Sequence, residues 1–458
     1  MGIGAVLEPL TVVVLLFGGT WINRQKDSKP RSHGTLSRSS SSSNNDEEAG
    51  FQPVAKQDTY GYPESRPLSP SLLHQHEPQW RRRSVGLGPY RFDVYSPNTA
   101  QFRNRFLSRL LYRLPFLVEC WYWALVYWIY QLGRAFTAVT LKDDTVDVAR
   151  KHAMQLVQLE KSLGIFVEVD IQRFFLARPT LMNWTNWIYS FIHIPGTIAF
   201  LVWLYYYTTT RTSLEGSSEK NGGSKPAKAI NGSPAGPLLY AARRRTLAVC
   251  NLLAFIVFTL WPCMPPRLLS DEKVGGNIGN VARSYGFVDT VHGEKGAGSV
   301  WTENRFCNQY AAMPSLHFGY SLMIGLTIMT IPLSAQHAQS TTTSRTRSIR
   351  LPLSSHRISL QFALPSWRRV LCVALGVAYP LTILAAIVAT ANHFILDAVA
   401  GACVCMLGWN GNVILLNLLP VEDYFLGALR LYKPERMVVD VNVESHGYEK
   451  RVHASVLS

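Results

Sequence analysis

Two histidines and an aspartate in this chain have the residue types and spacing for nucleophilic catalysis. His393 and Asp397 are four residues apart, so on a helix they share one face and can contact each other. A carboxylate that binds one imidazole nitrogen fixes the tautomer and leaves the other nitrogen free to attack. A second histidine, His317, has the chemistry to protonate a leaving group as a general acid.

An arginine, a serine and an asparagine near these residues predict a phosphate site. Arg267 offers a bidentate guanidinium. Ser315 opens a helix, where free backbone N–H groups favour an anion, and Asn392 directly precedes His393. The six residues together predict phosphoryl transfer through a phosphohistidine, a chemistry that requires neither a metal ion nor a cofactor. The seven cysteines form no CxxC pair and no zinc-like spacing with histidine.

The segments that carry these residues are unusually poor in charge. Of the 458 residues, 47% are apolar and 16% are charged, against about 25% charged in soluble domains. Uncharged runs cover residues 179–210, 246–266, 316–344, 370–393 and 398–421. A run of about 20 apolar residues crosses the bilayer core. The composition excludes a soluble enzyme, a coiled coil and a disordered regulator, and it predicts an all-α, multi-pass membrane protein.

Hydropathy predicts a core of six transmembrane helices, over residues 115–139, 184–207, 246–261, 316–331, 370–390 and 395–418. Residues 1–23 form either an N-terminal membrane anchor or a signal peptide, and the basic residues that follow favour an anchor. Residues 24–113 are polar and serine-rich, which predicts a disordered basic arm in the cytosol. The transmembrane catalytic domain is expected over 114–420, with flexible inserts at 208–240 and 334–365, and a cytosolic tail over 421–458.

Loop charge predicts the orientation in the membrane. Residues 334–369 hold six arginines and no acid, and residues 208–245 hold seven basic residues against two acidic ones. Such loops face the cytosol. The loops at 141–183 and 262–314 are balanced, with six basic against six acidic residues and five against five. Arg267, His317, His393 and Asp397 are therefore all expected at the luminal or extracellular side.

The net charge of +15 is a second feature that bears on partners. Basic loops of a membrane protein account for it, and no nucleic-acid-binding motif accompanies it. We therefore expect the bilayer and a membrane lipid as partners and no nucleic acid. The sequence indicates no protein partner.

Each motif also has a structural interpretation. A His-x-x-x-Asp pair can serve in helix capping, Pro265-Pro266-Arg267 can be a turn before an interfacial arginine, and Ser315 can be an N-cap. A catalytic site is favoured because all three motifs fall at helix ends on one membrane face.

The stretch Ala312-Met-Pro-Ser-Leu-His317, combined with His393-Phe-Ile-Leu-Asp397, resembles the type 2 phosphatidic acid phosphatase superfamily. The branch it resembles is that of the inositolphosphotransferases, which holds inositol phosphorylceramide synthase. Further marks are Leu159-Glu-Lys-Ser-Leu-Gly164 with Glu168 and Gln172, Tyr189 with His193-Ile-Pro195, and Pro265-Pro-Arg267.

This resemblance implies a six-helix core with its site at the membrane surface, on the luminal side of the Golgi or endoplasmic reticulum. It implies that His393 is the nucleophile, Asp397 its orienting partner and His317 the acid. Arg267 and Ser315 would hold the phosphate. The implied activity is lipid phosphotransfer, as in sphingolipid metabolism. A lipid phosphatase that releases free phosphate and a non-catalytic membrane scaffold or transporter remain as alternatives.

The chain departs from the superfamily's fullest pattern at two positions. Leu260 stands seven residues before Arg267, where a lysine is usual, and Ile387 stands six before His393, where an arginine is usual. The inositolphosphotransferase branch also lacks these two cations. Arg283, Lys295 and Arg305 are candidates to compensate.

Four further features bear on the site. His193 either lines the substrate cleft or bonds to a neighbouring helix, and Asp289-Thr290 is a candidate substrate contact. Cys263 and Cys307 are close enough to the motifs that a disulfide could join them in an oxidising compartment. The apolar rhythm of residues 149–175 predicts an amphipathic helix in the luminal interface.

Overall fold

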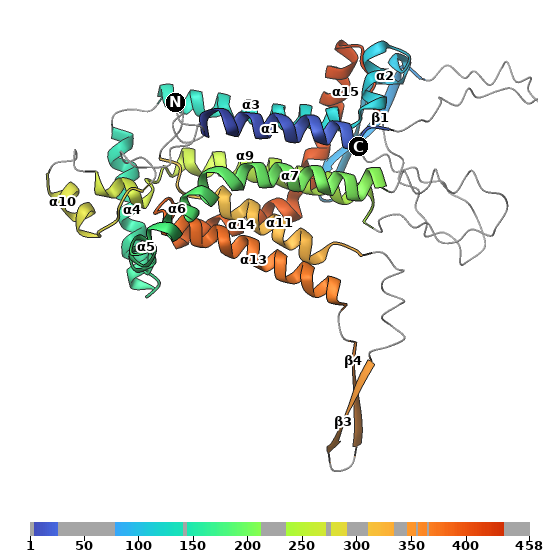
Figure 1. Cartoon of the computed structure of the whole chain (residues 1–458). Helices are drawn as coiled ribbons and strands as arrows, with labels where there is room; N and C mark the ends of the chain where they lie inside the picture. Colours follow the sequence, from blue (N-terminus) through green and yellow to red (C-terminus); the bar gives the residue numbers. More distant parts are fainter. Residues whose placement is uncertain are drawn as a thin grey trace, which may run out of the picture.

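The computed structural model describes residues 4–25, 78–140, 144–211, 235–271, 276–290, 310–333, 346–353, 356–363 and 366–434. The described chain is mostly helical, and its long helices lie side by side in a bundle (Figure 1). These helices are α1 (Gly4–Ile22), α3 (Phe116–Thr140), α7 (His193–Tyr205), α9 (Gly236–Leu260), α11 (Leu316–Thr330), α13 (Trp367–Ala389) and α14 (Ile395–Gly411).

Each of the six segments predicted as transmembrane contains a helix, although α9 begins at Gly236, ten residues before the predicted start at 246. α6 (Pro179–Trp187), η3 (Ile188–Ile192), α7 and η4 (Tyr206–Thr210) follow one another as a single helical rod. Within the described ranges, three helices are long and apolar enough to cross a membrane: Pro179–Thr210, Trp367–Ala389 and Ile395–Ala428. Pro9–Ile22 and Leu316–Thr330 are shorter apolar helices. Crossing by all six helices, and the anchor role of α1, stay predictions.

The N-terminal helix α1 packs against α7 and α3. A Cβ at Gly19 would lie 3.0 Å from both Phe116 and Val202, so this glycine sits directly against both helices. At the end of α1, Thr210 Oγ1 donates a 2.6 Å hydrogen bond to the buried Asn23 side chain. α1 is therefore an integral part of the helix packing.

Short helices cover one end of the bundle (Figure 1): α4 (Asp144–Ser162), α5 (Glu168–Leu176), α6 and α10 (Gly276–Ser284). The single amphipathic helix predicted over 149–175 is in fact two helices. α4 ends before Gly164, whose φ of +70° is the left-handed conformation that favours glycine at a helix C-terminus. The apolar face of α4 buries Ala149, Ala153 and Val157.

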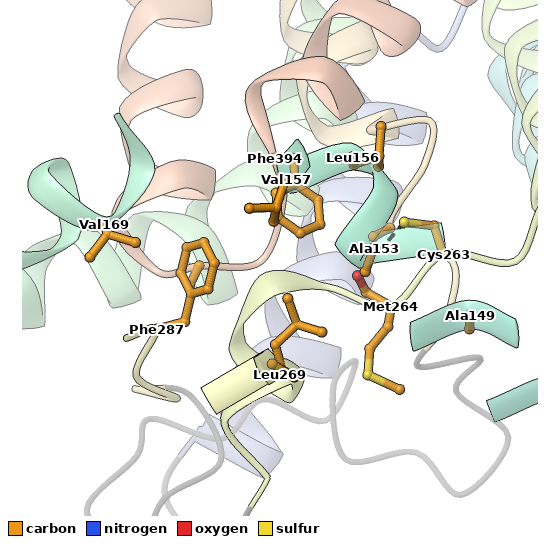
Figure 2. Close-up of a cluster of buried hydrophobic side chains, with 13 residues drawn as sticks. Ala149, Ala153, Leu156, Val157, Val169, Cys263, Met264, Leu269, Phe287 and Phe394 are labelled. Carbon is orange, nitrogen blue, oxygen red and sulfur yellow. Dashed lines mark hydrogen bonds between the residues drawn. The ribbon is translucent and has the colours of Figure 1, made fainter. Parts of the chain in front are cut away.

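That face of α4 closes a buried cluster with the loops of the motifs. Figure 2 shows its side chains converging on Phe394, which directly follows His393, and on Cys263 and Met264, which follow α9. Leu269, Phe287 and Val169 belong to the same buried cluster. The apolar packing of this layer supports the backbone that carries the predicted nucleophile.

At the opposite end of the bundle, residues 78–113 of the predicted disordered arm over 24–113 are folded, which corrects that part of the prediction. Strands β1 (Trp80–Leu87) and β2 (Tyr90–Pro97) form an antiparallel hairpin, followed by η2 (Thr99–Phe102) and α2 (Phe106–Arg113). The hairpin packs on α15 (Leu419–Ala428), where Arg83 and Ser96 both donate to the buried Asp423 carboxylate at 2.8 and 2.7 Å. These tertiary contacts offset the low apolar content of the segment. Residues 26–77 and 435–458 lie outside the described residues.

The two predicted inserts also have different bounds. Helix extends to Arg211 and resumes at Gly236, and residues 212–234 lie outside the described residues. Within 334–365, strands β3 (Thr346–Leu353) and β4 (His356–Ala363) form an antiparallel hairpin, which the serine and arginine content obscured. Its register places Ile349 opposite Leu360 and Leu351 opposite Ile358. This alternation of period two is typical of a strand.

Two glycines allow α11 and α14 to approach closely where the motifs begin. A Cβ at Gly401 would lie 2.2 Å from the Ser315 carbonyl oxygen, and one at Gly319 would lie 2.9 Å from the Gly401 carbonyl oxygen. Any larger residue would push the helices apart. The glycines therefore fix the distance between the start of α11 and the first turns of α14.

Candidate active site

The three predicted motifs meet at the end of the bundle that α4, α5 and α10 cover. Backbone hydrogen bonds join their loops directly. Cys263 N donates to Tyr310 O at 2.9 Å, Arg267 N to Ala391 O at 2.9 Å and Ser315 N to Asp397 O at 2.9 Å. The site is thus assembled from the exits and entries of α9, α11, α13 and α14, as the sequence predicted.

Local sequence features set the ends of the helices that carry the site. α9 ends at Leu260, two residues before Pro262, which has no N–H to continue the helix. The Ser315 side chain accepts from Phe318 N and caps α11. α13 ends at Ala389, and Ala391 then adopts φ +51°, a left-handed conformation uncommon for a residue other than glycine. That turn directs the chain through Asn392 and His393 into α14.

The tautomer of His393 is fixed by a backbone carbonyl. Its Nδ1 lies 2.8 Å from Ala312 O, and because a carbonyl oxygen only accepts, Nδ1 donates. In the neutral imidazole Nε2 then carries the lone pair. His393 is 6% exposed, so the residue is largely shielded from water.

Asp397 lies beside His393 without being its hydrogen-bond partner. Its Oδ2 is 3.6 Å from Nδ1, and instead accepts from Phe394 N at 2.8 Å. Its Oδ1 is buried and has no hydrogen-bond partner. The carboxylate therefore acts on the imidazole through its charge, while the Ala312 carbonyl sets the ring orientation.

Arg267 lies in η6 (Pro266–Ser270), and its side chain contacts two polar side chains from other segments. Its Nε donates to Asn392 Oδ1 at 2.9 Å, which connects the predicted phosphate ligand to the residue before the nucleophile. Its Nη1 forms an ion pair with Asp289 Oδ2 at 3.2 Å. Arg267 is 7% exposed. Its positive charge at the site is thus partly offset by a neighbouring carboxylate.

The segment that carries Asp289 is fixed by α5 and α6. Gln172 binds both the N–H and the carbonyl of Val288, at 3.0 and 2.8 Å. Thr290 Oγ1 donates to Asn186 Oδ1 at 3.3 Å. Asp289 is therefore placed against Arg267 by contacts on both sides of it.

His317 lies among aromatic rings in the first turn of α11. Tyr189 stacks on it with ring centroids 4.8 Å apart, His193 lies 4.9 Å away and His393 5.7 Å away. Of the two environments predicted for His193, the bond to a neighbouring helix is present, because the Tyr379 hydroxyl of α13 lies 3.3 Å from His193 Nδ1. A role in the substrate cleft stays a prediction. A cavity of about 240 Å³ adjoins His193 and His317, lined also by Ile194, Thr197, Ile198, Leu316 and Tyr320.

A comparison with known protein families identifies the superfamily to which this site belongs. The family model described as PAP2 superfamily matches residues 154–214, 235–338 and 358–410, which include all six predicted site residues. This chain belongs to the PAP2 superfamily. No curated protein and no solved structure gives a significant match to it.

Members of the PAP2 superfamily are generally phosphatases or phosphotransferases that act without a metal ion. A membrane enzyme acting on a lipid phosphate is consistent with this membership and with the apolar helices. Among the described residues, no group of three His, Cys, Asp or Glu side chains could hold a metal ion.

Some candidates do not reach the PAP2 site in the described residues. The Arg283 guanidinium donates to Asp271 O and Asn280 Oδ1 on the exposed side of α10. Cys263 is a free, buried thiol whose pKa is raised by burial, and its predicted partner Cys307 lies outside the described residues, as do Lys295 and Arg305.

Sequence reasoning missed three contributors to the PAP2 site. The Ala312 carbonyl is a backbone group, so no residue type announces it. Glu160 and Glu168 were noted only as marks of the resemblance, yet both are fully buried against the first turn of α14. The signal available in the sequence was a pair of glutamates eight residues apart, one on each side of Gly164.

Proposed function

We propose that this protein is an integral membrane phosphotransferase that moves the phosphoryl group of a lipid through a phosphohistidine on His393. The hydrogen bond from His393 Nδ1 to Ala312 O carries the proposal. In the neutral imidazole this bond leaves the lone pair on Nε2, in a site that also holds an arginine and a second histidine. By the orientation inferred from loop charge, this site faces the lumen.

The reaction follows in two steps. His393 Nε2 attacks phosphorus, a P–N bond forms, and the P–O bond to the leaving alcohol breaks as His317 protonates that oxygen. Arg267 and the N–H groups at the start of α11 stabilise the charge on the phosphoryl oxygens. In the second step His317 takes the proton of an acceptor alcohol, whose oxygen attacks phosphorus and releases His393.

The charges beside His393 favour a phosphodiester donor over a phosphomonoester. A monoester such as phosphatidic acid carries nearly two negative charges at neutral pH, and a diester such as phosphatidylinositol carries one. The positive guanidinium of Arg267 bonds to Asn392, the residue before His393. The Asp289 carboxylate lies 3.2 Å from Arg267 Nη1 and partly offsets this charge. The Coulomb energy of a second negative charge is unfavourable beside a carboxylate. We therefore favour a transferase over a phosphatase.

The burial of the site supports the same choice. His393 is 6% exposed, and Ser315 and Asp397 are fully buried. Excluding water favours an alcohol as the acceptor of the phosphoryl group. The cavity beside His317 lies between α7 and α11 and is lined in part by apolar side chains, which suits an alcohol carried on a lipid.

The test uses the full chain purified in detergent, with phosphorus-labelled phosphatidylinositol and phosphatidic acid, each with and without ceramide. We expect label to move from phosphatidylinositol to ceramide, and His393→Ala to abolish the transfer. His152→Ala is a matched control, because His152 Nδ1 also lies 2.8 Å from a backbone carbonyl, that of Pro262, outside the three motifs.

Two outcomes would contradict the proposal. Release of free phosphate from phosphatidic acid, faster than any transfer, would make the protein a lipid phosphatase. Equal inertness of the wild type and His393→Ala on both lipids would favour the non-catalytic scaffold.

A further inference from the structure

Three carboxyl groups hold the first N–H groups of α14, directly after the nucleophile. Asp397 Oδ2 accepts from Phe394 N at 2.8 Å, Glu168 Oε1 from Ile395 N at 3.0 Å and Glu160 Oε1 from Leu396 N at 2.9 Å. Such N–H groups have no partner within the helix. Here two of them are satisfied from α4 and α5, which carry none of the three motifs.

All three carboxyl groups are fully buried, and each has one oxygen with no hydrogen-bond partner: Glu160 Oε2, Glu168 Oε2 and Asp397 Oδ1. Three adjacent negative charges without water are strongly unfavourable. A bound proton on one carboxyl group removes a charge and supplies the donor that an unpaired oxygen requires. The unpaired oxygens therefore point to a buried proton.

The surroundings of Glu160 agree on where this proton resides. Burial, the adjacent Glu168 carboxyl group and the charge of Asp397 together raise the pKa of Glu160 to about 9, which favours its neutral form. The N–H of Leu396 acts in the opposite direction. The Cys263 thiol, in the loop after α9, also faces this group and is electrically neutral because its own pKa is raised by burial.

We propose that Glu160 and Glu168 share one proton and that the resulting pair is a positioning device for His393, holding the first turn of α14 at a fixed distance from Ala312. The two glutamates are positioning residues, since their contacts are to the backbone of Ile395 and Leu396 and not to a reacting atom. The effect on turnover rests on the proposed function.

The placement of this pair explains why α4 and α5 cover the site. His393 is two residues before Ile395. A shift of this turn would therefore displace the imidazole and disturb its 2.8 Å bond to Ala312 O. The same helix α5 also holds Val288 through Gln172, next to Asp289. α5 thus positions both the nucleophile and the carboxylate that faces Arg267.

The first test is hydrogen–deuterium exchange of the full chain in detergent, followed on the peptide that contains residues 393–398. Glu160→Ala and Glu168→Ala remove an acceptor, and we expect exchange of this peptide to rise about tenfold or more. Glu160→Gln keeps an acceptor for Leu396 N and replaces the shared proton with an amide N–H, so exchange should stay as in the wild type. Asp170→Asn, on the exposed face of α5, is the matched control.

The second test is the pH profile of lipid transfer. Glu160→Ala should lower kcat about tenfold with KM nearly unchanged, because the lipid does not contact Glu160. Wild-type kcat should fall as pH rises through about 9, where the shared proton is lost. In Glu160→Gln that alkaline loss should disappear, since the amide does not titrate.

Two results would overturn the inference. One is unchanged exchange of residues 393–398 in both alanine variants, and the other is an alkaline loss of kcat in Glu160→Gln equal to that of the wild type. Exchange does not depend on turnover. A wild type without lipid activity would therefore refute the proposed function while the exchange result still decides whether the glutamate pair holds α14.

Discussion

His393 Nδ1 donates a 2.8 Å hydrogen bond to the carbonyl oxygen of Ala312, which lies five residues before the general-acid candidate His317 in the same motif. The second motif therefore orients the nucleophile of the third through its backbone. The N–H of Ala312 donates in turn to Cys263 O, in the loop that leads to Arg267. One residue thus connects the nucleophile with the elements expected to bind phosphate.

Asp397→Asn should separate charge from orientation. The amide oxygen can still accept from Phe394 N, and Ala312 still orients the ring, so the fold and the tautomer are retained. The positive imidazole of the phosphohistidine loses a carboxylate 3.6 Å away. We expect kcat to fall about a hundredfold with little change in melting temperature. A kcat equal to that of the wild type would show that the carboxylate serves only to cap α14.

Asp289→Asn should change the choice of donor lipid. Removing the carboxylate that faces Arg267 leaves the guanidinium charge unopposed at this contact. We expect kcat/KM for a phosphomonoester, relative to that for a phosphodiester, to rise about tenfold. The ratio is measured by competition between the two labelled lipids. An unchanged ratio would contradict the charge-based preference for a diester.

Gly401→Ala should separate α11 from α14. The new methyl group would lie 2.2 Å from Ser315 O, so the helices must shift and the 2.9 Å bond from Ser315 N to Asp397 O must lengthen. Overpacking of this kind costs about 1–3 kcal/mol. Thermal unfolding in detergent measures the loss. Gly411→Ala is the matched control because nothing lies within 4 Å of its added methyl group, and equal effects of the two would contradict close packing at Gly401.

Stability should depend on pH through Glu160. Its pKa is about 9 in the folded chain and near 4.5 in the unfolded chain, so the folded state binds the proton over that whole interval. This contribution to stability is complete below pH 4.5 and is lost as pH rises toward 9. Melting temperatures across this range should fall less steeply for Glu160→Gln than for the wild type. Parallel curves would contradict a protonated Glu160.

Much of the helical fold could be predicted, because an uncharged apolar segment long enough to cross a bilayer is compatible with few structures other than a helix. The sites at helix ends followed from proline, serine and the position of His393 after an uncharged run. The β1–β2 hairpin could not be predicted, because its stability depends on Asp423, more than 300 residues away in sequence, receiving Arg83 and Ser96.

The candidate catalytic residues were easier to identify from the sequence than the groups that support them. His317, His393 and Arg267 can be recognised as candidates by residue type, and the structure brings them to one end of the bundle. The orienting group of His393 is a carbonyl, and the ligands of Ile395 N and Leu396 N come from separate helices. Such contacts depend on tertiary packing and leave no periodic signal in the sequence.

The most direct test of the central proposal is to trap the covalent intermediate. Full-length protein is mixed with lipid labelled at phosphorus, quenched rapidly at alkaline pH and digested for peptide mapping. We predict label on the peptide that contains His393, stable to base and labile to acid as a phosphoramidate is, present in His152→Ala and absent in His393→Ala. Turnover of the lipid with no label at His393, or with label on another residue, would contradict the proposal.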